Sequence, residues 1–277
     1  MTLAVKAEKI SALLKLAGKH EVEATVIGKF TNSGKFLSLY KGKIVTYMDM
    51  EFVHDGVPGM KMEGEWLTPE ERGLTEPALE DVKDHNAFLE EMLSRPNICS
   101  KEYIARQYDH EVQGTSVIKP LVGADRDVFS DAVVLRPVLN SKEGIAVSAG
   151  LNPKYSLIDT YHMTACALDE AVRRIIAVGG SLDQIALNDN FCWPSPIASQ
   201  NNPDAKYKMG QLVRANKALY DYTLAFRTPC ISGKDSMSLD GTVKDVNGAE
   251  HRISALPTIQ FSAAGKIDDV GKCITMD

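Results

Sequence analysis

The stretch that decides the fold is residues 159–191, DTYHMTACALDEAVRRIIAVGGSLDQIALNDNF. Its first part has apolar residues at helical spacing, which form one stripe: Leu168, Val172, Ile175, Ile176 and Gly179. We therefore predict a helix over residues 159–178, with this stripe lying on a sheet. Two glycines end the helix, and SLDQIALNDNF then predicts a turn and a strand.

The flanking sequence predicts more strands and only one further long helix. Strands are predicted in DAVVLRP (131–137), GIAVSAG (144–150), TPCISG (228–233) and LPTIQFSAAGKI (256–267), and a helix over 206–226. Two long helices are too few for a regular doubly wound sheet. The pattern favours an α/β (α+β) fold in which one mixed sheet is backed by two long helices.

The first 66 residues predict a smaller α/β piece. An apolar helical face ends near Gly18, and ATVIGKF (24–30) is a predicted strand. A hairpin is predicted next, because FLSLY and IVTYM flank a turn at residues 41–43. A unit of about 60 residues is only marginally stable alone. Residues 67–97 are acidic and contain prolines, which is typical of a linker, and residues 98–277 form the main domain.

Composition excludes several classes of function. The chain has 44% hydrophobic and 25% charged residues and a net charge of −6, which disfavours a nucleic-acid surface. No apolar run is long enough for a bilayer, and the start lacks a signal-peptide pattern. The five cysteines are widely spread along the chain, and their spacing is not that of metal ligands. We therefore expect reduced thiols in a cytoplasmic protein, and no zinc.

Glu170 is the first candidate for chemistry. It lies four residues before Arg174, on the side of the helix opposite the apolar stripe. Small neighbours such as Met163 and Ala167 share that side, so Glu170 could face a ligand or another layer of protein. An ordinary Glu–Arg pair explains the same residues, and from the residues alone it is the favoured interpretation.

Two further acids lie at predicted strand ends. Asp131 heads the run SDAVVL, where loops commonly build sites. Asp189 lies in LNDNF between two asparagines, and such a cluster could bind a hard cation or a ribose. A polar turn is the alternative in both cases.

The segment SGKDSMS (232–238) combines the groups that a phosphate site needs. Gly233 allows close backbone approach, Lys234 supplies a charge, Asp235 a magnesium ligand and Ser236 a hydroxyl. It is not a P-loop, because Thr228 stands where that motif needs glycine and Asp235 stands where it needs Ser or Thr. His110, in YDHEVQG, could be a base or phosphate donor, but a structural role is commoner.

Taken together and in order, these segments resemble a known family. Six consecutive segments are similar to the second half of formylglycinamide ribonucleotide amidotransferase: YDHEVQGTSVIKPLVG, SDAVVLRP, GIAVSAGLNP, LDEAVRRIIAVGG, IALNDNFCW and TPCISGKDSMS. A further segment, HDGVP, is similar to the junction between that enzyme's two halves. The resemblance implies an aminoimidazole ribonucleotide synthetase-like fold. Residues 1–66 would close the first half's C-terminal domain, and 98–277 would be the second half's ATP-binding N-terminal domain. A piece cut from a longer protein is the favoured explanation, and a naturally split subunit is the alternative.

The resemblance also implies a reaction and a site. The family uses ATP and glutamine to convert formylglycinamide ribonucleotide to formylglycinamidine ribonucleotide in purine biosynthesis. Asp131, Glu170 and Asp235 match positions that hold Mg²⁺, and we expect them to converge on one ion. Asp189, Gly233, Lys234 and Ser236 match positions near the phosphates of ATP, ADP or substrate. Arg174 stands where relatives carry a metal-binding Asn, which leaves the number of ions open.

Partners follow from the same resemblance. They are the remainder of the synthase, a glutaminase domain or subunit, small nucleotide substrates and a second copy in a homodimer, with no nucleic acid and no membrane. On this mapping the first half's N-terminal domain, which holds the family's catalytic histidine, is absent, so we expect no activity from the chain alone. The alternatives are a non-catalytic nucleotide-binding module that braces an assembly, or another superfamily enzyme such as selenophosphate synthetase, against which the HDGVP and YDHEVQG junction speaks.

Overall fold

The computed structural model describes residues 2–109 and 112–276. The chain divides into two compact units, Met1–Lys61 and Met62–Asp277. The segment expected to be a linker, 67–97, therefore belongs to the second unit. Among the described residues, none of the helices has the length and apolar character that a bilayer crossing requires.

The first unit is small and has few elements. It contains a 3₁₀ turn at Ala7–Lys9, α1 (Ile10–Lys19), the antiparallel hairpin of β1 (Lys35–Tyr40) and β2 (Lys43–Asp49), and α2 (Met50–Asp55). The predicted helix and hairpin are confirmed. The strand predicted over residues 24–30 is wrong, because this segment pairs with no described strand and its Ile27 and Phe30 are 82% and 91% exposed. Apolar spacing makes a strand only where a ladder partner exists.

The second unit is built on a six-stranded mixed sheet, with strand order β3-β6-β7-β12-β8-β9. Its strands are β3 (Ser116–Ile118), β6 (Val133–Leu135), β7 (Gly144–Leu151), β8 (Ile185–Cys192), β9 (Cys230–Ser236) and β12 (Thr258–Ile267). Every neighbouring pair is antiparallel except β8 and β9, which run parallel. The mixed sheet expected from the sequence is thus confirmed.

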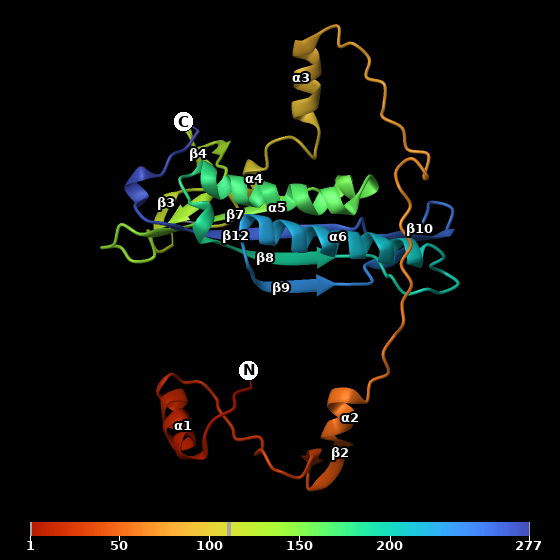
Figure 1. Ribbon diagram of the computed structural model, residues 1–277. Helices are drawn as coiled ribbons and strands as arrows, with labels where there is room; N and C mark the ends of the chain where they lie inside the picture. Colours follow the sequence, from red (N-terminus) through yellow and green to blue (C-terminus); the bar gives the residue numbers. More distant parts are fainter. Residues whose placement is uncertain (1, 110–111, 277) are drawn as a thin grey trace. The chain divides into compact units, whose positions relative to one another are not determined.

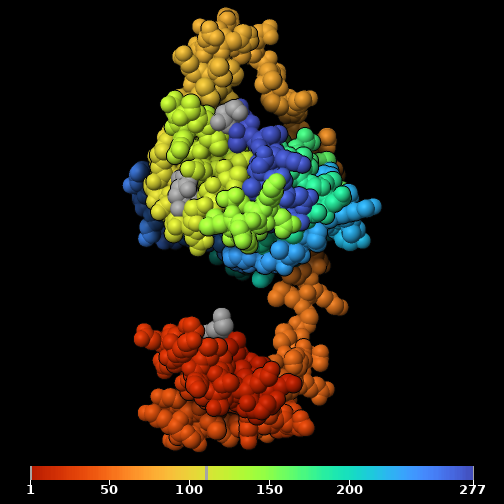
Figure 2. Space-filling view, turned by 90° about the vertical axis from the view of Figure 1, so that its left-hand side faces the viewer, coloured from red at the N-terminus to blue at the C-terminus, as the bar shows by residue number. Residues whose placement is uncertain are grey.

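Shorter elements surround the sheet. Two small hairpins are β4 (Leu121–Val122) with β5 (Val128–Phe129), and β10 (Asp240–Lys244) with β11 (Glu250–Ser254). The short helices are α3 (His85–Ser94) and α4 (Glu102–Ala105), with 3₁₀ turns at Pro153–Leu157, Leu182–Gln184 and Val270–Lys272. The C-terminal segment, dark blue in Figure 2, lies against the loop before β7, where the Val270 N–H donates to the Lys142 carbonyl.

The two long helices, α5 (Thr160–Ala177) and α6 (Ala205–Phe226), cover one face of this sheet (Figure 1). Leu168, Val172 and Ile175 of α5 are buried with sheet residues such as Leu187 and Phe261. The predicted stripe is wrong at Ile176, which is 45% exposed, whereas Met163 and Ala167 are fully buried. The difference arises because α5 also packs against α6, so its buried surface is wider than one stripe.

Gly150 brings α5 close to β7. A Cβ at this position would lie 1.9 Å from the Ala167 carbonyl oxygen, so only glycine allows the observed approach. Two residues before Gly150 on β7, the Ser148 hydroxyl donates to the Ala171 carbonyl at 2.6 Å. These contacts fix the middle of α5, and with it Glu170, against the end of β7.

Residues 63–73, which we call the strap, lie on α6. The Glu65 N–H donates to the Lys206 carbonyl at 2.9 Å, and the Trp66 ring stacks on Tyr207 with centroids 5.6 Å apart. The Arg214 guanidinium lies 4.3 Å from the Trp66 ring, a cation–π contact. Arg72 ends the strap by donating to the carbonyls of Leu157 and Ile158.

Candidate functional site

The polar residues predicted from the sequence lie at one end of the sheet. The strand register places Leu151, Gln260, Asn190 and Lys234 in one row across β7, β12, β8 and β9. Residues 188–192 and 232–236 run side by side to the ends of the parallel strands β8 and β9. Loops at strand ends are the usual place for a binding site in such sheets.

Glu170 is held at the β7 end of this row. Its Oε2 accepts hydrogen bonds from the Leu151 N–H and the Asn152 amide, both at 3.1 Å. Its Oε1 accepts from Arg174 at 2.5 Å, so the ordinary ion pair considered for the sequence is present. The carboxylate nevertheless faces the strand end, because the backbone of β7 supplies one of its partners.

The alternation of side chains along β9 separates the predicted phosphate residues into two sets. Lys234 Nζ donates to Ser236 Oγ, so these two side chains share one face. A Cβ on Gly233 would lie 2.8 Å from Asp189 Oδ1, which places Gly233 and Asp189 on the other face. That second face is the one covered by the helices, since Leu187, Asp189 and Phe191 alternate as buried residues along β8.

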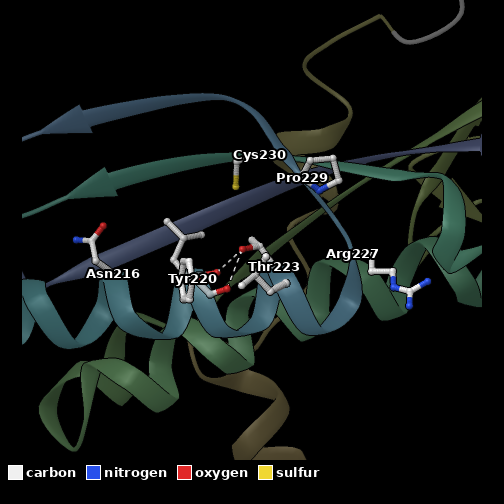
Figure 3. A pocket seen from close by; sticks show the side chains of 8 residues that line it. Asn216, Tyr220, Thr223, Arg227, Pro229 and Cys230 are labelled. Carbon is white, nitrogen blue, oxygen red and sulfur yellow. Dashed lines mark hydrogen bonds between the residues drawn. The ribbon is translucent and has the colours of Figure 1, made fainter.

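Asp189 and Cys230 form a polar pair inside the helix-covered face. Asp189 is 9% exposed, burial raises the pKa of its carboxyl, and the Cys230 thiol of β9 is one of its neighbours. Burial, reinforced by the charge of Asp189, raises the pKa of Cys230 to about 11. Although Cys230 is exposed as a residue, its thiol points from β9 toward α6 (Figure 3). No sequence pattern singles out Cys230 as a functional residue.

A groove opens beside this pair, between β9 and the second half of α6 (Figure 3). It encloses about 720 Å³ and is mainly apolar, with Leu219, Tyr220 and Leu224 along one wall and Pro229 and Cys230 along the other. None of the site residues predicted from the sequence lines it. The groove therefore does not coincide with the row of polar residues at the strand ends.

The three carboxylates expected to share one magnesium ion do not form a common group. Asp131 precedes β6, Glu170 contacts the end of β7, and Asp235 lies on β9. From β7 to β9 there are three strand spacings, about 14 Å at roughly 4.8 Å each, whereas Mg²⁺ binds oxygen at about 2 Å. Within residues 2–109 and 112–276, no three His, Cys, Asp or Glu side chains are grouped to hold a metal.

Sequence reasoning missed other polar residues at the same end. Asn152 and Gln260 carry no motif signal, and they join the site only through the strand register. Asn190 is already part of the Asn-Asp-Asn cluster noted in the sequence, and its Oδ1 atom is buried without a hydrogen-bond partner in the described part of the chain. His110, the other candidate from the sequence, lies outside the described residues.

Comparisons with known proteins point in one direction. A family model described as FGAR-AT PurM_N-like domain matches residues 100–265. Phosphoribosylformylglycinamidine synthase subunit PurL from Methanocaldococcus jannaschii is 32% identical over 98% of this chain and 34% of its own length. The same subunit from Picrophilus torridus is 32% identical over 94% of the chain and 32% of its length. The chain thus spans about a third of these relatives.

Solved structures share the fold. PurLQS from Thermotoga maritima aligns over 99% of this chain and 38% of its own, with a TM-score of 0.65 and 19% identity. Thermotoga maritima PurL complexed with ATP aligns over 97% of this chain and 37% of its own, with a TM-score of 0.61 and 18% identity. At this identity the likeness supports the fold alone and not the chemistry of single residues.

Proposed function

The chain belongs to the FGAR-AT PurM_N-like domain family, and from this premise we propose that it supplies a nucleotide-phosphate site to a PurL-type phosphoribosylformylglycinamidine synthase. The proposed activity is the ATP-dependent conversion of formylglycinamide ribonucleotide to formylglycinamidine ribonucleotide, a C–N ligation in purine biosynthesis. The chain would contribute one part of that enzyme, since its relatives are about three times as long.

One observation carries the proposal: Lys234, Ser236 and Asn190 meet at the ends of the parallel strands. A lysine ammonium is a common phosphate ligand, and the hydroxyl and amide can bind the same oxygens. Phosphoryl transfer depends on positioning and charge more than on covalent chemistry, so a site of this composition suffices to hold a nucleotide. Thermotoga maritima PurL was solved with ATP, ADP and formylglycinamide ribonucleotide, which is consistent with that ligand class.

Magnesium fits this site only as an ion that the nucleotide brings with it. Mg²⁺ is usually bound by one or two carboxylates together with substrate phosphates. Asp131, Glu170 and Asp235 can each supply one such ligand, and in the described part of the chain they are not grouped around one position. Their individual roles as ligands remain predictions. When bound, the ion would neutralise phosphate charge, while Lys234 and Ser236 hold the phosphate in place.

The proposed partners are the rest of the synthase, a glutaminase as the ammonia source and a second copy of the chain. One solved relative was determined as PurLQS, which supports assembly with other subunits. We further propose a cytoplasmic location. Its support is that all five cysteines are free thiols, as expected in a reducing compartment.

Calorimetric titration with Mg-ADP tests the site. We expect the chain to bind Mg-ADP, and Lys234→Ala to weaken that binding by roughly tenfold, as for the loss of one hydrogen bond to a charged group. Lys244→Ala is the matched control, because Lys244 lies on the exposed hairpin strand β10 and pairs only with Glu250 among the ion pairs of the described chain. Equal binding by wild type and Lys234→Ala would contradict the proposal.

A further inference from the structure

The Asp189 carboxyl lies against the backbone of β9 at Gly233, next to Lys234 and on the strand that also carries Ser236. The space next to Gly233, where a side chain would begin, is occupied by the Asp189 carboxyl, whose oxygens lie 2.8 Å and 3.0 Å from an ideal Cβ. The residue is 9% exposed, so this carboxyl is enclosed by protein. It therefore contacts the strand from the face opposite to the lysine.

The Cys230 thiol, at the start of β9, is a neighbour of this carboxyl. Cys230 and Asp189 share the helix-covered face, and the thiol lies near enough to the carboxyl for the charge of Asp189 to raise the pKa of Cys230. Because the pKa of Cys230 is raised to about 11, its thiol is protonated at neutral pH and can donate. The Asp189 carboxyl of β8 thus lies next to both Cys230 and Gly233 of β9.

β9 needs such an anchor because it is an edge strand. Among the described strands it pairs with β8 alone, and the pairing is irregular between Leu187 and Asn188, opposite Cys230 and Ser232. Most of its residues are exposed. An edge strand paired on one side, with a break in the ladder, has little else to fix its backbone.

We propose that Asp189 is a positioning residue, which together with Cys230 fixes the backbone of residues 230–236 so that Lys234 and Ser236 present their side chains to phosphate. This inference rests on the proposed function and deepens it. It replaces direct contact between Asp189 and the nucleotide, which the sequence comparison had favoured. A buried carboxylate on the opposite face is badly placed to meet a phosphate, and it carries the same sign of charge.

Amide hydrogen exchange of the full chain without nucleotide tests the anchor. In Asp189→Ala and Cys230→Ala, we expect faster exchange in peptides covering residues 231–236. Cys230→Ser restores a hydroxyl donor, so exchange should return toward the wild-type rate. Peptides from α5 serve as the internal control and should not change. Unchanged exchange at 231–236 in both alanine variants, or an equal increase in α5, would overturn the inference.

A double-mutant cycle tests the contact itself. Gly233→Ala inserts a methyl group against the Asp189 carboxyl, and Asp189→Ala removes that carboxyl. Because the second change relieves the clash made by the first, exchange at 231–236 in the double variant should be slower than the two single effects predict when combined. Additive effects would show that the two residues do not touch, which would count against the proposal.

Mg-ADP titration separates this inference from the proposed function. If wild type binds, Asp189→Ala and Cys230→Ala should weaken binding by roughly tenfold, with recovery in Cys230→Ser. Binding that is unchanged in both alanine variants would overturn the positioning role. If wild type does not bind Mg-ADP, the proposed function fails, and the exchange experiment still decides whether Asp189 and Cys230 anchor the strand.

Discussion

At the scale of single residues, the account depends on which face of a strand a side chain occupies. Lys234 and Asp235 are adjacent in sequence but point to opposite faces of β9, and so do Asn190 and Asp189 on β8. A motif such as SGKDS therefore does not act as one cluster. Lysine and serine face one way, and the glycine and aspartate positions face the helices.

Asp221 gives a pH-dependent prediction. Hydrogen bonds from Lys217, and from the Tyr161 hydroxyl at 2.9 Å, hold the pKa of the Asp221 carboxyl below its ordinary 3.8. A lowered folded-state pKa means that this contribution to stability is complete above pH 3.8 and is lost as the pH falls through the folded-state value. Asp221→Asn should therefore lower the urea midpoint at pH 7, and the difference should shrink in acid.

The control for this prediction is Tyr161→Phe, which removes one hydrogen bond and leaves the Lys217 pair. It should show a smaller pH dependence of its deficit than Asp221→Asn. A deficit in Asp221→Asn that stays constant from neutral pH to below pH 3.8 would refute the assignment.

At the scale of elements, glycines set how closely α5 and α6 approach their neighbours. Gly150→Ala would place its methyl group 1.9 Å from the Ala167 carbonyl oxygen, so α5 must move away from β7. We expect a loss of about 1–3 kcal/mol in the free energy of unfolding, measured by urea denaturation. Gly241→Ala on β10, where nothing lies within 4 Å, should cost far less. Equal losses would argue against the close packing.

Gly210 makes a comparable prediction for the strap. A Cβ there would lie 2.0 Å from the Glu65 carbonyl oxygen, so Gly210→Ala should lift residues 63–73 from α6. Alanine favours a helix over glycine by about 1 kcal/mol, so α6 itself should not suffer. We expect faster tryptic cleavage after Arg72, which is otherwise held by the Leu157 carbonyl. Cleavage at the wild-type rate would show that the strap is held elsewhere.

The sequence predicted these elements far better than it predicted their contacts. Periodicity located α5, α6 and β8 because helix and strand spacing are local properties. The row from Leu151 to Lys234 depends on register between strands that are more than 40 residues apart, which local patterns do not encode. For the same reason the predictions of a buried Ile176 and of a strand over residues 24–30 are wrong.

At the scale of the whole molecule, the two units differ in how they are stabilised. Within residues 2–61 no helix or strand has a buried residue, whereas α5 and β12 of the second unit lie in a continuous core. Local stability follows burial. In hydrogen exchange of the full chain, amides of α1, β1 and β2 should therefore exchange much faster than those of α5 and β12. Equal protection in both units would contradict this difference.

The residues proposed for the site lie in the second unit, and so does the family match over residues 100–265. The central claim is that the ends of β8 and β9 hold the phosphates of a nucleotide. A crystal structure of the chain grown with Mn²⁺ and ADP tests it most directly, since the metal can be located by its anomalous signal. The account predicts phosphate oxygens at Lys234 and Ser236, with no Mn²⁺ ion bound jointly by Asp131, Glu170 and Asp235. Nucleotide seated in the groove between Tyr220 and Cys230, with its phosphates away from Lys234, would contradict the account.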